Sequence, residues 1–208
     1  MMISFAITTH NEGHYIQELL DQLIPHCEKT GDEIVVVDDN STDGYTAQIL
    51  YNYADKKIRL YNHALDNDFA EHKNYLNSLC QGDYIFQIDA DEKIHDNLLT
   101  YLHDIVYNNT NVEMFLIPRV NVVTGLTDAD VQRWGWHVNE KGWVVFPDYQ
   151  TRLYKNTPEI KWEGKVHERI VGYKTHAPLP AEEEWALYHI KDIQRQREQN
   201  DYYETIIR

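Results

Sequence analysis

The stretch from Asp83 to Glu92, which reads DYIFQIDADE, constrains the fold of this chain more than any other. Its apolar residues between Tyr84 and Ile88 have the β-branched and aromatic character of a buried strand. The strand ends at Asp89–Glu92, where three of four residues are carboxylates. Like charges this close repel one another and raise one another's pKa unless a cation lies among them. Mg²⁺ or Mn²⁺ held together with substrate phosphates is the simplest solution, and a solvated acidic turn is the alternative.

Short apolar strands alternate with amphipathic helices through the first 120 residues. The strands are expected at 3–8, 33–37, 58–61, 84–88 and 114–120, the last interrupted by an edge or bulge at Pro118. The helices are expected at 15–27, 47–53 (capped by Ser41 or Thr42), 69–80 and 98–106. This alternation predicts an α/β fold with a mostly parallel, doubly wound sheet flanked by helices. Ligands of such sheets bind outside the carboxyl ends of the strands, so we expect Thr8, Asp38 and Asp89 to face one crevice.

The pattern changes after Val120. Residues 121–148 contain few aliphatic runs but three tryptophans, Trp134, Trp136 and Trp143. These rings are either a platform for an acceptor or ordinary core packing. We expect strands at 149–154 and 166–171 and a charged segment at 181–208 that is helical near its end. No internal repeat or low-complexity linker divides the chain, so we predict a single domain over residues 1–208.

Charge and cysteine content limit the partners and the compartment. The net charge of -15 argues against a nucleic-acid partner, because proteins that bind nucleic acid present basic faces. Two cysteines, Cys27 and Cys80, make a disulfide framework improbable and favour a reducing cytoplasm. No apolar stretch is long enough to span a bilayer, although peripheral membrane contact through a partner stays open.

Four stretches of the first half resemble the family-two glycosyltransferases of the GT-A fold: FAITTHNEG, EIVVVDDNSTDG, HKNYLNSLCQGDYIF and DADE. The second half is more loosely similar to bacterial cell-surface polysaccharide glycosyltransferases, through PDYQTRLYKN, WEGKVHERI and LYHIK. The resemblance implies a GT-A-type, Rossmann-like domain, with the donor bound by residues 1–120 and the acceptor by residues 121–208. It also implies transfer of a hexose from a nucleotide sugar, usually a UDP-sugar, to an acceptor hydroxyl in polysaccharide biosynthesis, with inversion at the anomeric carbon.

The same resemblance assigns roles to individual positions. Thr9, Glu12 and Asp39 are expected to contact the nucleotide, with Asp39 accepting the uracil ring N–H. Lys73 is expected to meet the donor phosphates, although a solvated helix lysine is an equal alternative. Asp89 is expected to contact the ribose. The Asp-x-Asp motif of Asp89 and Asp91, completed by His189, is expected to bind Mn²⁺ or Mg²⁺.

The general base is expected within the sequence Val166-His167-Glu168. Glu168 at the mouth of the site could take the proton from the acceptor hydroxyl. His167 stands where the family commonly carries Glu, so His167 and Asp148 remain alternatives for the base.

Two other functions remain open at this stage. An Asp-x-Asp phosphohydrolase would use Asp89 as a nucleophile. A glycan-binding or nucleotide-binding module without catalysis would keep the same fold. The sequence does not determine the sugar, the acceptor, the linkage or the oligomeric state.

Overall fold

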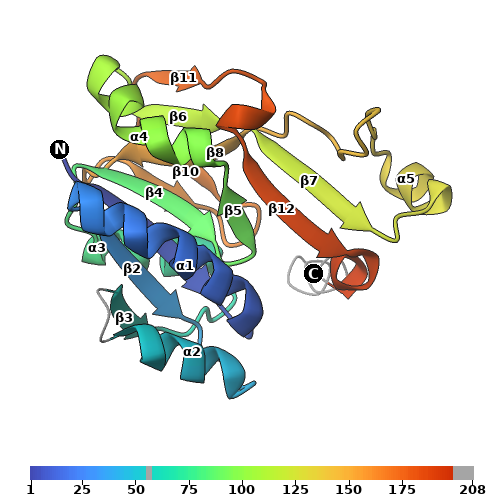
Figure 1. Ribbon diagram of the computed structural model, residues 1–208, viewed down its shortest axis with the longest axis horizontal. Helices are drawn as coiled ribbons and strands as arrows, with labels where there is room; N and C mark the ends of the chain where they lie inside the picture. Colours follow the sequence, from blue (N-terminus) through green and yellow to red (C-terminus); the bar gives the residue numbers. More distant parts are fainter. Residues whose placement is uncertain (55–57, 199–208) are drawn as a thin grey trace.

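A seven-stranded sheet forms the centre of the computed structural model, which describes residues 1–54 and 58–198 (Figure 1). The strand order is β11-β6-β8-β4-β1-β2-β3. The strands are β1 (Ile3–Thr9), β2 (Glu33–Asp38), β3 (Ile58–Asn62), β4 (Tyr84–Asp89), β6 (Met114–Ile117), β8 (Gln150–Lys155) and β11 (His176–Pro178). Neighbouring strands pair in parallel except around β8, which runs antiparallel to both β4 and β6. The predicted α/β fold with a mostly parallel sheet is confirmed.

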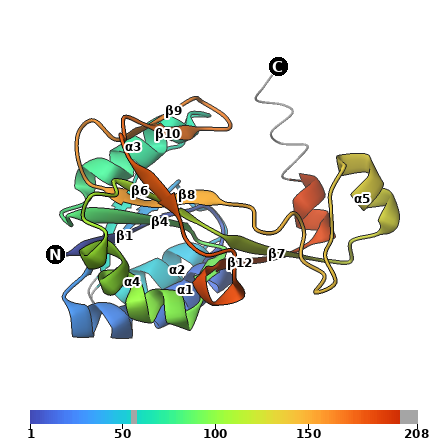
Figure 2. The same ribbon diagram turned by 90° about the horizontal axis from the view of Figure 1, so that it is seen from above.

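Both faces of the sheet are covered, which explains why its central strands are continuous apolar runs. One face packs against α1 (Gly13–Thr30), α2 (Tyr45–Ala54) and α4 (Asp96–Asn108). The other face packs against α3 (Phe69–Leu79) and a hairpin of β9 (Lys161–Glu163) and β10 (Arg169–Val171). Figure 2 shows these two layers on opposite sides of the sheet. Side chains alternate between the layers, so that Val36 packs with α1 and α2 while Val35 packs with α3.

A second, three-stranded sheet extends from the first in the order β5-β12-β7 (Figure 1). Its strands are β5 (Glu92–Ile94), β12 (Leu187–Asp192) and β7 (Arg119–Thr124), with the short helices α5 (Asp128–Trp134) and η1 (Glu183–Trp185) nearby in the chain. The predicted strand at 114–120 is therefore two strands in different sheets, separated at Pro118. Proline has no N–H for a sheet ladder, and the chain leaves the large sheet at that residue.

Two other local predictions need correction. Asp43 caps the second helix instead of Ser41 or Thr42, because its Oδ1 accepts the backbone N–H of Thr46 at 2.9 Å. The strand expected at 166–171 begins only at Arg169. The segment 181–208 contains β12 and is helical at 193–198, in agreement with the helix expected near its end, while residues 199–208 lie outside the described part.

Strand register brings the polar strand ends together. Thr9 of β1 is paired with Asp38 of β2, and Thr8 of β1 is paired with Asp89 of β4. β1 lies between β2 and β4, so the strands that follow β1 in the chain are placed first on one side of it and then on the other. The carboxyl end of β1 is therefore the topological switch point, where ligands of doubly wound sheets bind. In the part of the chain that the structure describes, no helix combines the length and apolar character needed to cross a membrane.

The β9–β10 hairpin depends on a close backbone contact at its base. Gly172 has φ of 89°, and a Cβ there would lie 1.8 Å from the carbonyl oxygen of Glu159. We expect Gly172→Ala to lower the free energy of unfolding by roughly 2–5 kcal/mol, since left-handed backbone strain and a backbone clash add together. Urea denaturation measures this change.

Gly31 provides a matched control, because its φ is 81° and a Cβ there meets nothing within 4 Å. Gly31→Ala should cost only the strain of about 1–2 kcal/mol. Equal destabilisation by the two variants would contradict the importance of the contact.

Candidate functional site

A cavity of about 360 Å³ lies at the switch point, beyond the carboxyl ends of β1, β2 and β4. Eight of the predicted site residues line it: Thr9, Glu12, Asp39, Lys73, Asp89, Asp91, Glu168 and His189. Among its other lining residues are Thr8, His10, His72, Arg119, Lys191 and Arg195. His167 is exposed and does not line the cavity. Residues as far apart in the sequence as Thr8 and Arg195 therefore meet in one place.

The two aspartates that end β2 have different partners. Asp38 accepts hydrogen bonds from the backbone and hydroxyl of Ser41 at 3.1 and 2.5 Å, so it shapes the following loop. Asp39 lines the cavity and accepts the backbone N–H of Leu65 at 2.8 Å through Oδ1. Nearby, the buried Oγ1 of Thr9 has no hydrogen-bond partner within the described structure. Buried hydroxyls are normally hydrogen-bonded, so this atom is available to a ligand.

The carboxylates at the end of β4 are compensated by arginines. Arg152, on β8, donates to Asp89 and to Glu92, the latter at 2.8 Å. Arg119, at the start of β7, also reaches Glu92 at 3.0 Å. Burial alone would raise the pKa of Asp89, but the guanidinium of Arg152 lowers that pKa well below its ordinary range. Arginines therefore offset the charges of Asp89 and Glu92, a compensation that the sequence alone did not indicate.

Asp91 points to the small sheet and meets His189 of β12. Nε2 of His189 lies 3.3 Å from Oδ2 of Asp91, and Nδ1 lies 3.0 Å from Oδ1 of Asn121. The amide of Asn121 donates to Oδ2 of Asp148 at 2.7 Å, which leaves its Oδ1 as the acceptor facing His189. Nδ1 of His189 therefore carries a hydrogen. Nε2 then needs either a proton or a metal ion between itself and Asp91.

Asp89 is turned away from this pair. Asp89, Asp91 and His189 do not bring three ligand atoms within 4.8 Å of one another, whereas another group in the described chain, His26, Asp32 and His103, does. Burial by itself would raise the pKa of Asp91, but the hydrogen bond with His189 lowers it. Asp91 is therefore an ionised ligand candidate beside an imidazole nitrogen.

Arg195 adds a cation at Oδ2 of Asp91, the same oxygen that faces His189. It donates to Asp91 at 3.1 Å and to Glu12, and its guanidinium lies 4.7 Å from the ring centre of Tyr15. Burial raises the pKa of Glu12 to about 7, and the charge of Asp91 adds to this rise. Burial lowers the pKa of Lys191, also in the cavity, to about 8. Carboxylates and cations are thus interleaved around the cavity.

Lys73 and Glu168 form an ion pair across the cavity. Nζ of Lys73 lies 2.5 Å from Oε1 of Glu168 and 4.5 Å from the ring centre of Trp162. The two side chains are only 10% and 15% exposed, so Lys73 is not the solvated helix lysine of the alternative interpretation. Asp148, the other proposed base, accepts from Arg119, Asn121 and Gln150 and lies outside the cavity lining. The geometry therefore favours Glu168 over Asp148 and His167.

Residues 4–170, more than half of the chain, match the model of the family described as glycosyl transferase family 2. The chain belongs to glycosyl transferase family 2. The resemblance seen in the sequence is confirmed.

Known relatives agree with this membership. The glycosyltransferase GlyG of Streptococcus pneumoniae serotype 4 is 27% identical over 107 residues, which make up 50% of this chain and 35% of GlyG. The crystal structure of S. aureus TarS 1-349 superposes with a TM-score of 0.65 at 20% identity, covering 91% of this chain and 60% of that one. The same TarS fragment in complex with UDP-GlcNAc gives 0.64 at 21% identity, covering 92% and 59%. The chain thus spans less than two thirds of each of these relatives, and TarS shows the shared GT-A fold.

Sequence reasoning missed the cations of this family 2 site: Arg119, Arg152, Lys191 and Arg195. Arg152 lies within PDYQTRLYKN, a stretch that carried the resemblance, so its position offered a signal. Lys191 and Arg195 look like ordinary surface charges in the sequence. Only the pairing of β12 with β7 and β5 brings them to the cavity.

The tryptophans do not form one platform. Trp143 is buried against Phe146 and covered by Lys141, whose Nζ lies 4.3 Å from the ring centre. Trp134 and Trp136 contact each other, with ring centres 4.6 Å apart, and are partly exposed beside α5. Core packing is therefore the better interpretation for Trp143.

Arg152 is 3% exposed and holds the end of β4 against β5. We expect Arg152→Gln to lower the free energy of unfolding by about 3 kcal/mol, because the fully buried Glu92 and the partly exposed Asp89 lose their shared cation. Chemical denaturation measures the loss.

Lys141→Gln serves as the control, since Lys141 and its partner Glu183 are 61% and 39% exposed. It should change stability by less than about 1 kcal/mol. A small effect of Arg152→Gln, similar to this control, would show that Arg152 is dispensable for the network.

Proposed function

We propose that this chain transfers a sugar from a nucleoside diphosphate sugar, a UDP-sugar in particular, to an acceptor hydroxyl with inversion at the anomeric carbon. The observation that carries the proposal is the meeting of Asp39, Asp91, Glu168 and His189 in one cavity of a glycosyl transferase family 2 chain. The complex of TarS with UDP-GlcNAc supports a nucleotide sugar as the donor class.

The charges of the cavity are consistent with an anionic donor. Asp39 offers a carboxylate oxygen to the uracil N–H, and the unpartnered hydroxyl of Thr9 lies on the same side. Lys73 and Arg119 offer cations to the diphosphate. This local basic set explains how a chain with a net charge of -15 could hold a donor of the same sign.

A divalent metal, Mn²⁺ or Mg²⁺, fits the atoms around Asp91. The hydrogen on Nδ1 of His189 leaves Nε2 facing the carboxylate of Asp91, and imidazole with carboxylate is a suitable ligand set for Mn²⁺. Asp91 and His189 would hold the ion, with Asp89 as a further candidate. When bound, the ion would neutralise charge on the departing diphosphate. Arg195, which contacts Asp91 at 3.1 Å, would compete with the ion for the same carboxylate.

Glu168 is the proposed general base. Oε1 of Glu168 lies 2.5 Å from Nζ of Lys73, so the two side chains form an ion pair with each other in this structure. Donor phosphates would draw Lys73 away from Glu168 and free the carboxylate to accept a proton from the acceptor hydroxyl. The base would then become available when the donor is in place.

Glu168→Gln tests this role. We expect kcat for transfer, or for slow donor hydrolysis without an acceptor, to fall about 10²–10⁴-fold, because the amide cannot accept the proton. The release of UDP measures turnover, and calorimetry measures the dissociation constant of UDP, which should change little.

Glu163→Gln is the matched control on the same hairpin, since Glu163 is 50% exposed and forms an ion pair with the similarly exposed Lys161 at 3.2 Å. It should leave turnover unchanged. Full activity of Glu168→Gln would remove Glu168 as the base, and donor binding by the wild-type chain without turnover would favour the non-catalytic module.

Asp91→Asn tests the metal. In the wild-type chain, Mn²⁺ should raise both UDP affinity and turnover, and the variant should lose this dependence, with metal affinity weakened by roughly 10–100-fold or more. A thermal-shift series with UDP, with and without Mn²⁺, reports binding because ligands stabilise the native state.

Asp104→Asn, at an exposed position of α4, controls for the loss of one acidic charge. Metal dependence that persists unchanged in Asp91→Asn would contradict the proposed ligand. A phospho-aspartate trapped at Asp89 would instead support a phosphohydrolase, for which the pairing of Asp89 with Arg152 gives no support.

A further inference from the structure

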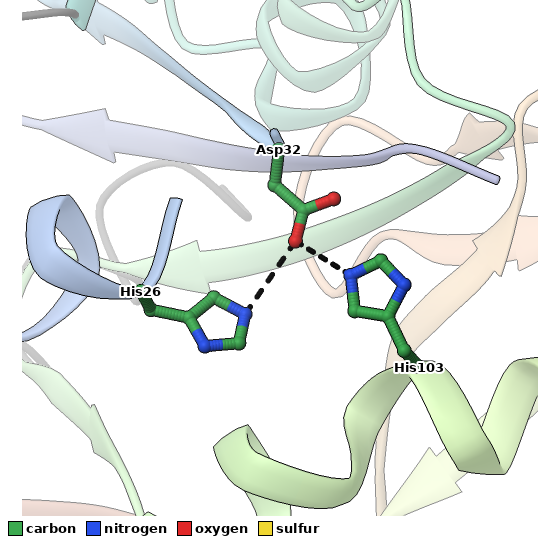
Figure 3. Close-up of side chains that lie close together, drawn as sticks. All are labelled: His26, Asp32 and His103. Atoms are coloured by element: carbon green, nitrogen blue, oxygen red, sulfur yellow. Dashed lines mark hydrogen bonds and ion pairs between the residues drawn. The ribbon is translucent and has the colours of Figure 1, made fainter. Parts of the chain in front are cut away.

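Two histidines and an aspartate converge at the opposite end of the sheet from the nucleotide cavity (Figure 3). Asp32 lies immediately before β2, and Asp39, immediately after the other end of this strand, lines the cavity. His26 lies in the last turns of α1, and His103 lies on α4. Three segments that are separate in the sequence thus place ligand-type side chains around one point.

The distance between His26 and Asp32 matches that of two ligands on one metal ion, while the shorter distance between His103 and Asp32 is that of a hydrogen bond, which an ion would replace. Nε2 of His103 lies 2.7 Å and Nε2 of His26 lies 3.4 Å from Oδ2 of Asp32, and all three atoms lie within 4.8 Å of one another. Ligands about 2.0–2.2 Å from a tetrahedral zinc ion are roughly 3.3–3.5 Å apart. Figure 3 shows both rings turned with a nitrogen toward the carboxylate oxygen.

Hydrogen bonding within the protein leaves this group incompletely satisfied. Nε2 of His26 is buried and has no hydrogen bond of acceptable geometry, although it faces Asp32. Oδ2 of Asp32 already accepts from the hydroxyl of Thr30 at 2.7 Å and from His103. A carboxylate oxygen has two lone pairs, so a third donor is surplus to its capacity. A cation between the rings and the carboxylate would give every one of these nitrogens a partner.

The surroundings hold the carboxylate in a fixed orientation. Oδ1 of Asp32 accepts the backbone N–H of Ile3 at 2.8 Å, and the side chain is fully buried. Such outer contacts orient metal ligands in proteins. His103 is 31% exposed, which provides an entry path and room for a water ligand.

We propose that His26, Asp32 and His103 bind one divalent transition-metal ion of the zinc class, with solvent completing the coordination. Two imidazoles and one carboxylate favour zinc over Mg²⁺, which prefers oxygen ligands throughout. The bound ion joins the end of α1, the start of β2 and α4, so it stabilises the packing of α4 on the first strand–helix–strand unit. This site is independent of the proposed function, because none of its residues lines the nucleotide cavity.

The test uses the chain without a polyhistidine tag, stripped of metal with a chelator and then dialysed. Isothermal titration with Zn²⁺ should show one strong site, and the melting temperature should rise on its occupation. His103→Gln and His26→Gln should each weaken this site by roughly 10–100-fold or more. Because the chain has eleven histidines, adventitious binding needs a control.

His14→Gln is that control, since His14 lies on the same helix, is 72% exposed and pairs with Glu18. It should leave the strong site intact, and so should Asp91→Asn at the cavity. Loss of the site in Asp91→Asn, or full affinity in both His103→Gln and His26→Gln, would overturn the proposal.

Co²⁺ supplies a measurement that needs no variant. One equivalent bound by nitrogen and oxygen ligands in a tetrahedral site should give the intense visible absorption typical of that geometry, and Zn²⁺ should displace it. Absence of this absorption from the folded wild-type chain would also overturn the site.

Discussion

The geometry of the cavity depends on arginines that pair with two carboxylates at the end of β4, the buried Glu92 and the partly exposed Asp89. Asp89 ends a strand of the large sheet and Glu92 begins a strand of the small sheet, and Arg152 contacts both. Like charges buried this close would oppose folding without a shared cation. The network therefore fixes the junction of the two sheets, and it directs Asp91, which lies between these carboxylates in the sequence, toward β12.

The small sheet supplies the second half of the site. β12 pairs with β7 in the register that sets His189 beside Asn121, and Asn121 in turn determines which nitrogen of His189 carries the hydrogen. The same strand places Lys191 in the cavity, and the helical residues after it bring in Arg195. Protein cations thus contact the carboxylates of the cavity, and the proposed donor and metal would compete with these contacts. The affinity for a ligand consequently depends on the difference in free energy between the ion pairs that the ligand forms and the ion pairs within the protein that it replaces.

Prediction from sequence worked best where local pattern and sheet topology agree. The apolar strands, their helical connections and the pairing of Thr8 with Asp89 follow from periodicity and from the rule that parallel strands share a carboxyl edge. Asp38, expected in the same crevice, is bound to Ser41, and its neighbour Asp39 lines the cavity instead. Prediction was less accurate at strand ends. The strand expected at 114–120 is divided at Pro118, where the chain leaves the large sheet. The strand expected from Val166 begins only at Arg169. Loop conformation there is set by contacts with distant residues, such as the hydrogen bond from Phe69 to the carbonyl of Lys165.

By itself the sequence determined the α/β class, the family resemblance and the carboxylates at the strand ends, because these depend on neighbours within a few positions. Tertiary structure alone decided which charges meet: Lys73 with Glu168, Arg152 with Asp89, and His26 and His103 with Asp32. The reason is the short range of ion pairs and metal bonds, which act over a few ångströms in space. Segments far apart in the chain reach that range only after the sheets and helices have packed.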